Sequence, residues 1–218
     1  MIKHIFTFAG KDFLLELKRP YLLNGMLLYV VSTVFICYLA FDGIIDERTW
    51  NVLYWIVILF ASVNSAGRSF SEEFSKRHLY YYSIANPAAI ILGKMCYNAV
   101  LLVIVALLGF SVFSLFLGIP VESRVMFMLA AIAGNISFAI LLTMVAGIAS
   151  RAEENFTLMA ILSFPIALPK LLILINLTRN AIERGIWSEA IKPFASLFVL
   201  QILIIVLALL LFPYLWKD

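Results

Sequence analysis

The stretch that decides the fold is Met95 to Val121, MCYNAVLLVIVALLGFSVFSLFLGIPV, which carries no charged residue. A helix that rises about 1.5 Å per residue needs about 20 apolar residues to cross the hydrocarbon core of a bilayer. Five further runs along the chain are similarly apolar, although the run that begins at Asn155 reaches the required length only if Lys170 is tolerated within it. They predict an all-α integral membrane protein whose six spans cover about 20–41, 49–67, 88–118, 125–150, 156–177 and 193–216.

The composition agrees with a membrane protein. The chain is 64% hydrophobic and 13% charged, whereas about 25% of the residues of a soluble domain are charged. With 218 residues and short connections, the sequence predicts a single transmembrane domain over 1–218 and no appended catalytic domain. The net charge of +3 is small and the basic residues are scattered along the chain, so nucleic acid is not an expected partner.

The distribution of basic residues predicts the orientation. An even number of spans places both termini on one side, and ten of the sixteen Lys and Arg residues fall on that side. Because basic residues stay in the cytoplasm, both termini are expected there. Four of the six basic residues on the other side lie between spans five and six, which weakens the bias without reversing it.

Residues 1–19 are predicted to form an amphipathic helix on the inner leaflet, before Pro20 turns the chain into the first span. Charged residues alternate with apolar ones spaced three or four apart. A plain basic flank that anchors the first span is the alternative. The apolar positions are Ile2, Ile5, Phe6, Ala9, Phe13, Leu14 and Leu17.

The longest polar stretch, 68–87, connects spans two and three on the predicted cytoplasmic side. Large side chains stand beside charges there, which is typical of a protein interface with a buried anchor and a polar rim. An aromatic belt at the start of span three would explain the tyrosines equally well. The residues expected to contact a partner are Phe70, Glu72, Glu73, Phe74, Lys76 and Arg77.

Several short motifs, in order along the whole chain, resemble the CcmB family, the membrane subunit of the ABC-type complex of cytochrome c maturation. The chain departs from the family pattern over 76–82, where members tend to have a glycine and a leucine-rich run. The motifs are Glu16-Leu17-Lys18-Arg19-Pro20, Leu59-Phe60-Ala61-Ser62, Phe70-x-Glu72-Glu73 with Leu79, Ser83-x-x-x-Pro87 and Leu92-Gly93-Lys94, and Phe164-Pro165 with Pro169-Lys170.

The resemblance implies a permease subunit of ABC-2-like architecture, with an N-terminal elbow helix, six spans and a coupling helix within 68–87. That helix would dock into a separate ATP-binding subunit in a bacterial inner membrane. The complex would also contain a haem-handling membrane subunit and would have haem as its cargo. A second copy of the chain and membrane lipid are further expected partners.

The chain itself shows no enzyme motif. The pair Gly93-Lys94 has Ala88 where a P-loop needs its first glycine and Met95 where it needs Ser or Thr, so ATP hydrolysis is expected from the partner. No metal or cofactor bound by this chain is predicted, and His4 and His78 are not expected to ligate haem. Trp50, Trp55 and Trp216 are interpreted as aromatic anchors at the membrane surface.

Two features inside the spans stand out. Small or mildly polar residues recur every four positions in span four, at Ala131, Asn135, Ala139, Thr143 and Gly147. Such a stripe allows close helix approach, either within the chain or, as the weaker alternative, between subunits. In span five, Pro165 and Pro169 are predicted to bend the helix. Lys170 is expected to extend toward the membrane surface, with a substrate contact as the alternative.

After that bend, residues 178–192 are predicted to form a periplasmic amphipathic helix, because apolar and charged residues alternate there at helical spacing. The favoured function is a permease subunit that couples ATP hydrolysis by a separate subunit to haem export or delivery. The alternatives are an ABC-2 type permease for a lipid, polysaccharide or drug, a membrane scaffold, and an unrecognised lipid-modifying enzyme.

Overall fold

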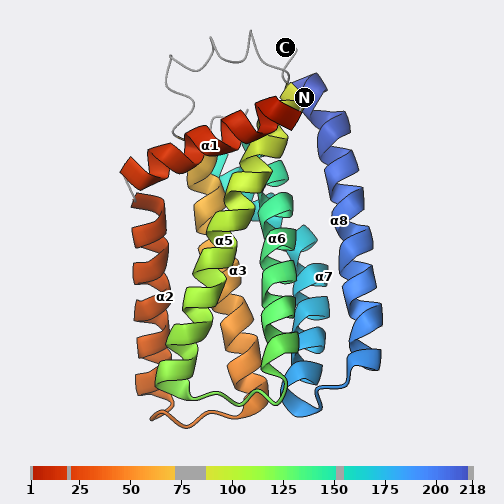
Figure 1. Ribbon diagram of the computed structural model, residues 1–218. Helices are drawn as coiled ribbons and strands as arrows, with labels where there is room; N and C mark the ends of the chain where they lie inside the picture. The colour runs from red at the N-terminus through yellow and green to blue at the C-terminus, as the bar shows by residue number, and fades with distance from the viewer. Residues whose placement is uncertain (1, 19–20, 72–86, 151–154, 216–218) are drawn as a thin grey trace.

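Seven helices make up the described part of the chain, which covers residues 2–18, 21–71, 87–150 and 155–215 of a computed structural model and contains no strand. Six helices stand side by side, and the seventh, α1, lies across one end of the bundle (Figure 1). The helices are α1 (Ile2–Lys18), α2 (Tyr21–Ala40), α3 (Glu47–Ser71), α5 (Pro87–Leu117), α6 (Arg124–Ala149), α7 (Asn155–Glu183) and α8 (Trp187–Leu215).

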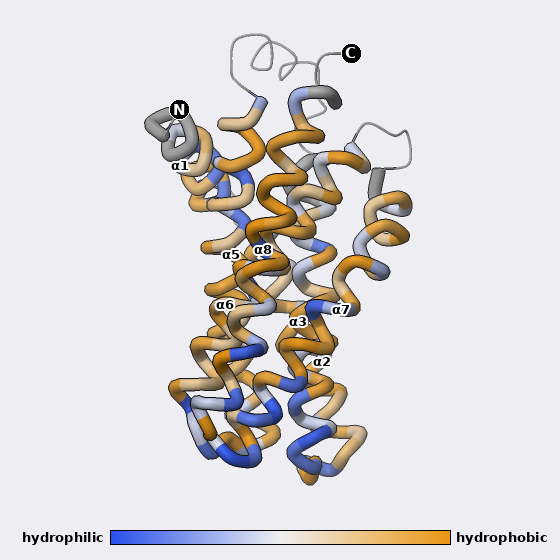
Figure 2. The backbone as a smooth tube through the Cα atoms, turned by 90° about the vertical axis from the view of Figure 1, so that its right-hand side faces the viewer, coloured by the Kyte–Doolittle hydropathy of each residue, from blue (hydrophilic) through white to orange (hydrophobic). Residues whose placement is uncertain are grey.

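The six upright helices confirm the six predicted spans, since each is long and apolar enough to cross a membrane. They alternate in direction, so the described ends of the chain lie at the end that carries α1, here called the near end (Figure 1). The opposite end is called the far end. In Figure 2, hydrophilic residues gather at the far-end connections, whereas hydrophobic colours dominate the helices above them. Six apolar helices joined by hydrophilic connections make this a multi-pass membrane protein.

The core lies around α3, of whose span 72% is buried. Trp50 stacks on Tyr54 with ring centroids 5.8 Å apart, and both rings contact Phe113 and Phe127 edge-on or tilted. Trp55 is also fully buried. The interpretation of Trp50 and Trp55 as surface anchors is therefore wrong. Both face the other helices, because α3 is enclosed on most sides, and aromatic pairs add about 0.5–1.5 kcal/mol beyond their buried area.

The predicted separate helix at 178–192 is also wrong. Residues up to Glu183 continue α7, and residues from Trp187 onward begin α8. The break falls at Gly185, whose φ of 66° is left-handed and whose amide donates to the carbonyl of Asn180 at 2.7 Å. A glycine in this conformation ends a helix because it has no Cβ to clash. The amphipathic pattern thus spans two helix ends.

Helix α7 runs without interruption across Pro165 and Pro169. Helix α8 likewise contains Pro193 and Pro213, and it begins six residues before the predicted start of span six. Neighbouring helices in a membrane can satisfy the backbone groups that proline frees. The bend at Pro165 and Pro169 stays a prediction.

Candidate functional site

The predicted coupling segment joins two helix ends at the near end of the bundle. Helix α3 ends there at Ser71, and α5 begins there at Pro87. Phe70 belongs to the last turn of α3, but its side chain lies outside the described part. So do Glu72, Glu73, Phe74, Lys76 and Arg77. The contacts proposed for these six residues therefore remain predictions.

Directly after this segment, α5 is fastened to α1 by a buried ion pair. Lys94, seven residues into α5, is 3% exposed, and its Nζ lies 3.7 Å from Oδ2 of Asp12 on α1. One turn further, the hydroxyl of Tyr97 donates to Oε2 of Glu16 at 3.4 Å. The ring of Tyr97 meets Phe13 edge-on at 5.9 Å. The other carboxylate oxygen of Glu16 accepts the amide of Leu23 at 2.9 Å, which adds α2 to the junction.

Sequence reasoning considered Gly93-Lys94 as part of a family motif and as a fragment of a phosphate loop, and it missed this junction. A signal was present, because Asp12 and Glu16 are four apart and Lys94 and Tyr97 are three apart. Residues at these spacings share one helix face, so two matched polar faces were available to pair. Nothing in the sequence indicated that α1 would meet α5.

The small-residue stripe of α6 is covered by the chain's own helices. The five residues Ala131, Asn135, Ala139, Thr143 and Gly147 are all buried. Thr143 Oγ1 accepts a hydrogen bond from Asn98 Nδ2 on α5 at 2.8 Å. A Cβ at Gly147 would lie 2.7 Å from the ring of Phe212 on α8. In this conformation the stripe packs α6 against α5 and α8.

Lys170 lies inside the bundle and does not extend toward the membrane surface, so that expectation is wrong. The residue is 1% exposed, and its Nζ donates to Ser137 of α6, to Oγ at 2.7 Å and to the carbonyl oxygen at 3.1 Å. Its helix face is shared with buried Ala167 and Leu174, whereas Leu168 and Leu172 are exposed. The inward direction of this face leaves the ammonium no route along the lipid side.

A chain of hydrogen bonds ties α3 to α7 in the far-end half of the bundle. Trp55 Nε1 donates to Thr178 Oγ1 at 2.8 Å, and that hydroxyl lies 2.7 Å from Asn51 Oδ1, to which it donates. Asn51 Nδ2 in turn donates to the carbonyl of Ile175 at 2.9 Å. These buried groups therefore satisfy one another, which is what buried polar atoms require.

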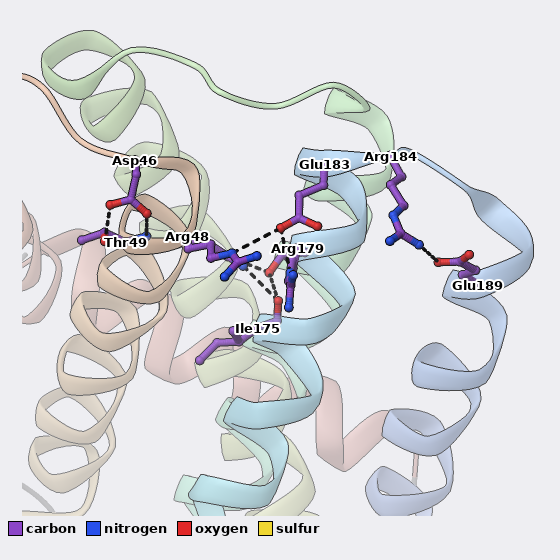
Figure 3. A network of polar contacts seen from close by, with 10 residues as sticks. Asp46, Arg48, Thr49, Ile175, Arg179, Glu183, Arg184 and Glu189 are labelled. Carbon is purple, nitrogen blue, oxygen red and sulfur yellow. Dashed lines mark hydrogen bonds and ion pairs between the residues drawn. The ribbon is translucent and has the colours of Figure 1, made fainter.

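The far-end surface carries a network of charges (Figure 3). Glu183 pairs with Arg179 at 2.7 Å and with Arg48 of α3 at 3.7 Å, and Arg184 pairs with Glu189 at 3.6 Å. A pocket of about 180 Å³ opens between α3 and α7. Two arginines and two glutamates line it, so their charges balance. The lining residues are Glu47, Arg48, Asn51, Val52, Ile175, Asn176, Arg179, Ile182 and Glu183.

Asp46 begins α3 at this same end. Its carboxylate accepts the hydroxyl of Thr49 at 2.6 Å and the amide of Thr49 at 3.1 Å. These two hydrogen bonds hold the pKa of the Asp46 carboxyl below its ordinary value. Asp46 is thus an N-cap residue for α3.

The arrangement contains a surface helix fixed to a span, a connection that enters that span, and a buried cation in the middle of the bundle. No match was found among curated proteins. A comparison with known protein families matches residues 5–215 to the family described as CcmB protein. The chain therefore belongs to the CcmB family, a membrane permease subunit, distinct from the ATPase, of the haem exporter in cytochrome c maturation.

Proposed function

We propose that this chain converts ATP-driven movement of its ATPase partner into a tilt of α5, received through segment 68–87. Membership of the family implies an ABC complex with an ATPase subunit. The observation that carries the proposal is the junction of Asp12 with Lys94, which lies on α5 directly after the segment. A push on the segment would reach α3, α5 and α1 together, since the buried pair resists separation of α1 from α5.

The same proposal includes the orientation and the assembly. The near end faces the cytoplasm of a bacterium, where ATP is available, and the far-end charge network faces the periplasm. A haem-handling membrane subunit and a second copy of the chain complete the complex, and haem is its cargo. Support comes from the excess of basic residues on the near-end side. Reporter fusions after Asp218 and at Gly185 should report cytoplasm and periplasm respectively; the reverse result contradicts the orientation.

The contact with the ATPase is tested by copurification with the tagged chain. Phe70→Ala with Phe74→Ala should release the ATPase, because aromatic anchors carry most of the binding energy of an interface. Glu72→Lys with Glu73→Lys should weaken recovery in a manner that depends on salt, because charge pairs at an interface rim are screened.

A matched control is Phe35→Ala with Phe41→Ala, two exposed phenylalanines on α2 and just beyond its end. This pair should leave ATPase recovery unchanged. Full recovery of the ATPase with both segment variants, at low and at high salt, would show that segment 68–87 is not the coupling contact.

A further inference from the structure

Lys170 places a cation in the middle of the membrane. It lies fifteen residues from Asn155 and thirteen from Glu183 along α7, and its partner Ser137 is thirteen residues from Arg124 and twelve from Ala149 along α6. At about 1.5 Å per residue, both residues are about 20 Å from either end of the bundle. Ionisable residues at this depth are costly to bury and mark functional positions.

Within the described part of the chain, no carboxylate lies where it can neutralise this cation. Each of the chain's 13 Asp and Glu residues lies in α1, in a connection or near the end of a helix. Along the helix axes, those that belong to the described residues are about 15 Å or more from the level of Lys170. Within the described residues, the only acceptors bound to Nζ are the two oxygens of Ser137. An ammonium group has three hydrogens to donate, so one is left beyond the two bonds made within the described residues.

A second polar group without a partner lies at the same depth on α8. Both the nitrogen and the oxygen of the Gln201 side-chain amide are buried, and within the described residues neither has a hydrogen-bond partner. Gln201 shares the inward face of α8 with Leu197, Ile204 and Ala208, all buried. A buried polar atom without a partner costs about 1–3 kcal/mol, so this amide also calls for an explanation.

The register of the helices places Gln201 at the same depth in the bundle as Lys170 and its partner Ser137. Helices α6 and α8 run in the same direction, and Gly147 of α6 faces Phe212 of α8. Ser137 lies ten residues before Gly147 on α6, and Ile202, the neighbour of Gln201, lies ten residues before Phe212 on α8. Gln201 is also fourteen residues from each end of α8. One level of the bundle therefore holds a lysine on α7, a serine on α6 and an unpartnered amide on α8.

We propose that Lys170, Ser137 and Gln201 form a mid-membrane site for the carboxylate of an apolar molecule, which the site admits when α8 moves away from α6 and α7. Lys170 supplies charge and Gln201 supplies an amide donor, the two donor types that a carboxylate accepts. Helix α8 is the movable wall, because only 22% of its span is buried, against 61% for α6. The inference rests on the proposed function, in which ATP-driven movement opens the bundle and haem, a dicarboxylate, is the cargo.

The test uses the complex with its ATPase, in a chain whose two cysteines, Cys37 and Cys96, are replaced by Ala. In that background, Ser137→Cys places a thiol beside Lys170. The rates at which this thiol reacts with an anionic and with a cationic methanethiosulfonate are measured. Each rate is divided by the rate of the same reagent with a solvent-exposed cysteine. A positive charge about 4 Å away should favour the anionic reagent at least about five-fold. Lys170→Met and Lys170→Gln should each abolish the preference.

Ala139→Cys is the matched control, since Ala139 lies at nearly the same depth on the stripe that faces α5. This cysteine should react slowly with both reagents. Failure of both reagents to reach Ser137→Cys, with and without ATP, would overturn the site. Equal normalised rates for the two reagents would overturn the role of Lys170.

The carboxylate is tested with haem and with haem dimethyl ester, at a fixed nucleotide state. Haem should slow anionic labelling of Ser137→Cys several-fold, and both the ester and haem in the Lys170→Met chain should have little effect. Equal protection of the Ser137→Cys thiol by haem and by its ester would refute carboxylate recognition. Slow labelling of this thiol without added haem, caused by a copurified subunit that covers it, would refute it as well. If ATP leaves the rates unchanged while haem protects and its ester does not, the coupling proposal fails and the site stands.

Discussion

Charged side chains have different partners at the ends of the bundle and in its middle. At the near end, Lys94 is 3% exposed and pairs with Asp12 of the same chain, and at the far end Glu183 holds two arginines. In the middle, Lys170 is equally buried, but its acceptors among the described residues are only the two oxygens of Ser137. The polar groups at the ends pair with one another across helices. The cation in the middle has no carboxylate partner among the described residues, as the proposed site for an external carboxylate requires.

The strongest test of this difference is to replace Lys94 and Lys170, one at a time, by methionine. Lys94→Met should lower the unfolding free energy by about 3 kcal/mol, because it leaves the partly buried Asp12 without this partner. That corresponds to a fall in melting temperature of about 6–12 °C for a chain of this size. Lys170→Met should leave the melting temperature unchanged or raise it, since an unpaired buried cation is removed. Both are measured in detergent by the loss of the monodisperse peak on heating.

An equal loss for both lysines would refute the contrast, because it would make Lys170 a structural residue. Lys192→Met, at an exposed position, is the control and should change little.

A second test concerns the buried network that joins α3 to α7. Thr178→Val keeps the shape of the side chain but deprives Trp55 Nε1 and Asn51 Oδ1 of their partner. The expected loss is about 2 kcal/mol, or about 4–8 °C in melting temperature. Thr33→Val on α2 is the matched control, because the hydroxyl of Thr33 donates to the carbonyl of Tyr29, one turn away on the same helix. Similar losses for the two variants would contradict the importance of the network.

A third test measures the coupling between Ser137 and Lys170. Ser137→Ala removes the hydroxyl at 2.7 Å but leaves the carbonyl oxygen as an acceptor, so a loss of about 1 kcal/mol is expected. In a Lys170→Met chain the same substitution should be nearly neutral. The difference between the two values, obtained from melting curves, is the pairwise interaction energy. A difference of zero would mean that the hydrogen bond contributes nothing to stability.

The smallest effect is expected at Asp46, in the exposed far-end turn. The pKa of its carboxyl is lowered in the folded protein, so the charged form stabilises the fold above the ordinary pKa of an aspartate. This contribution disappears as the pH falls through the lowered pKa. Asp46→Asn, which retains a capping oxygen, should melt slightly below the unaltered chain at pH 7, and the gap should close at low pH. A gap that widens on acidification would contradict the assigned sign.

The sequence was sufficient for the spans because the physics of a bilayer acts on composition alone. An uncharged run of the right length has few other structures available, and α5 and α6 follow their predicted ranges closely. The boundary between α7 and α8 was missed because amphipathic spacing continues through Gly185, whereas the left-handed turn there depends on hydrogen bonds to Asn180.

Side-chain direction was harder to predict than helix position. Trp50, Trp55 and Lys170 were all expected at the membrane surface because of their residue types, yet all three face the interior. In a chain whose helices are apolar on every side, periodicity does not distinguish the lipid face from the protein face. The pairing of Asp12 with Lys94 could not be predicted for a different reason, since it depends on which helices are neighbours.

The position of α1 has a mechanical consequence for the lipid around the protein. Because α1 lies across the near end and is fixed to α5 through Asp12 and Tyr97, a tilt of α5 must press α1 into the leaflet or lift it out. In the proposed mechanism, each stroke would then perform work against the lateral pressure of the headgroups. The rate of the complex should therefore vary with bilayer thickness and curvature, even at constant ATP.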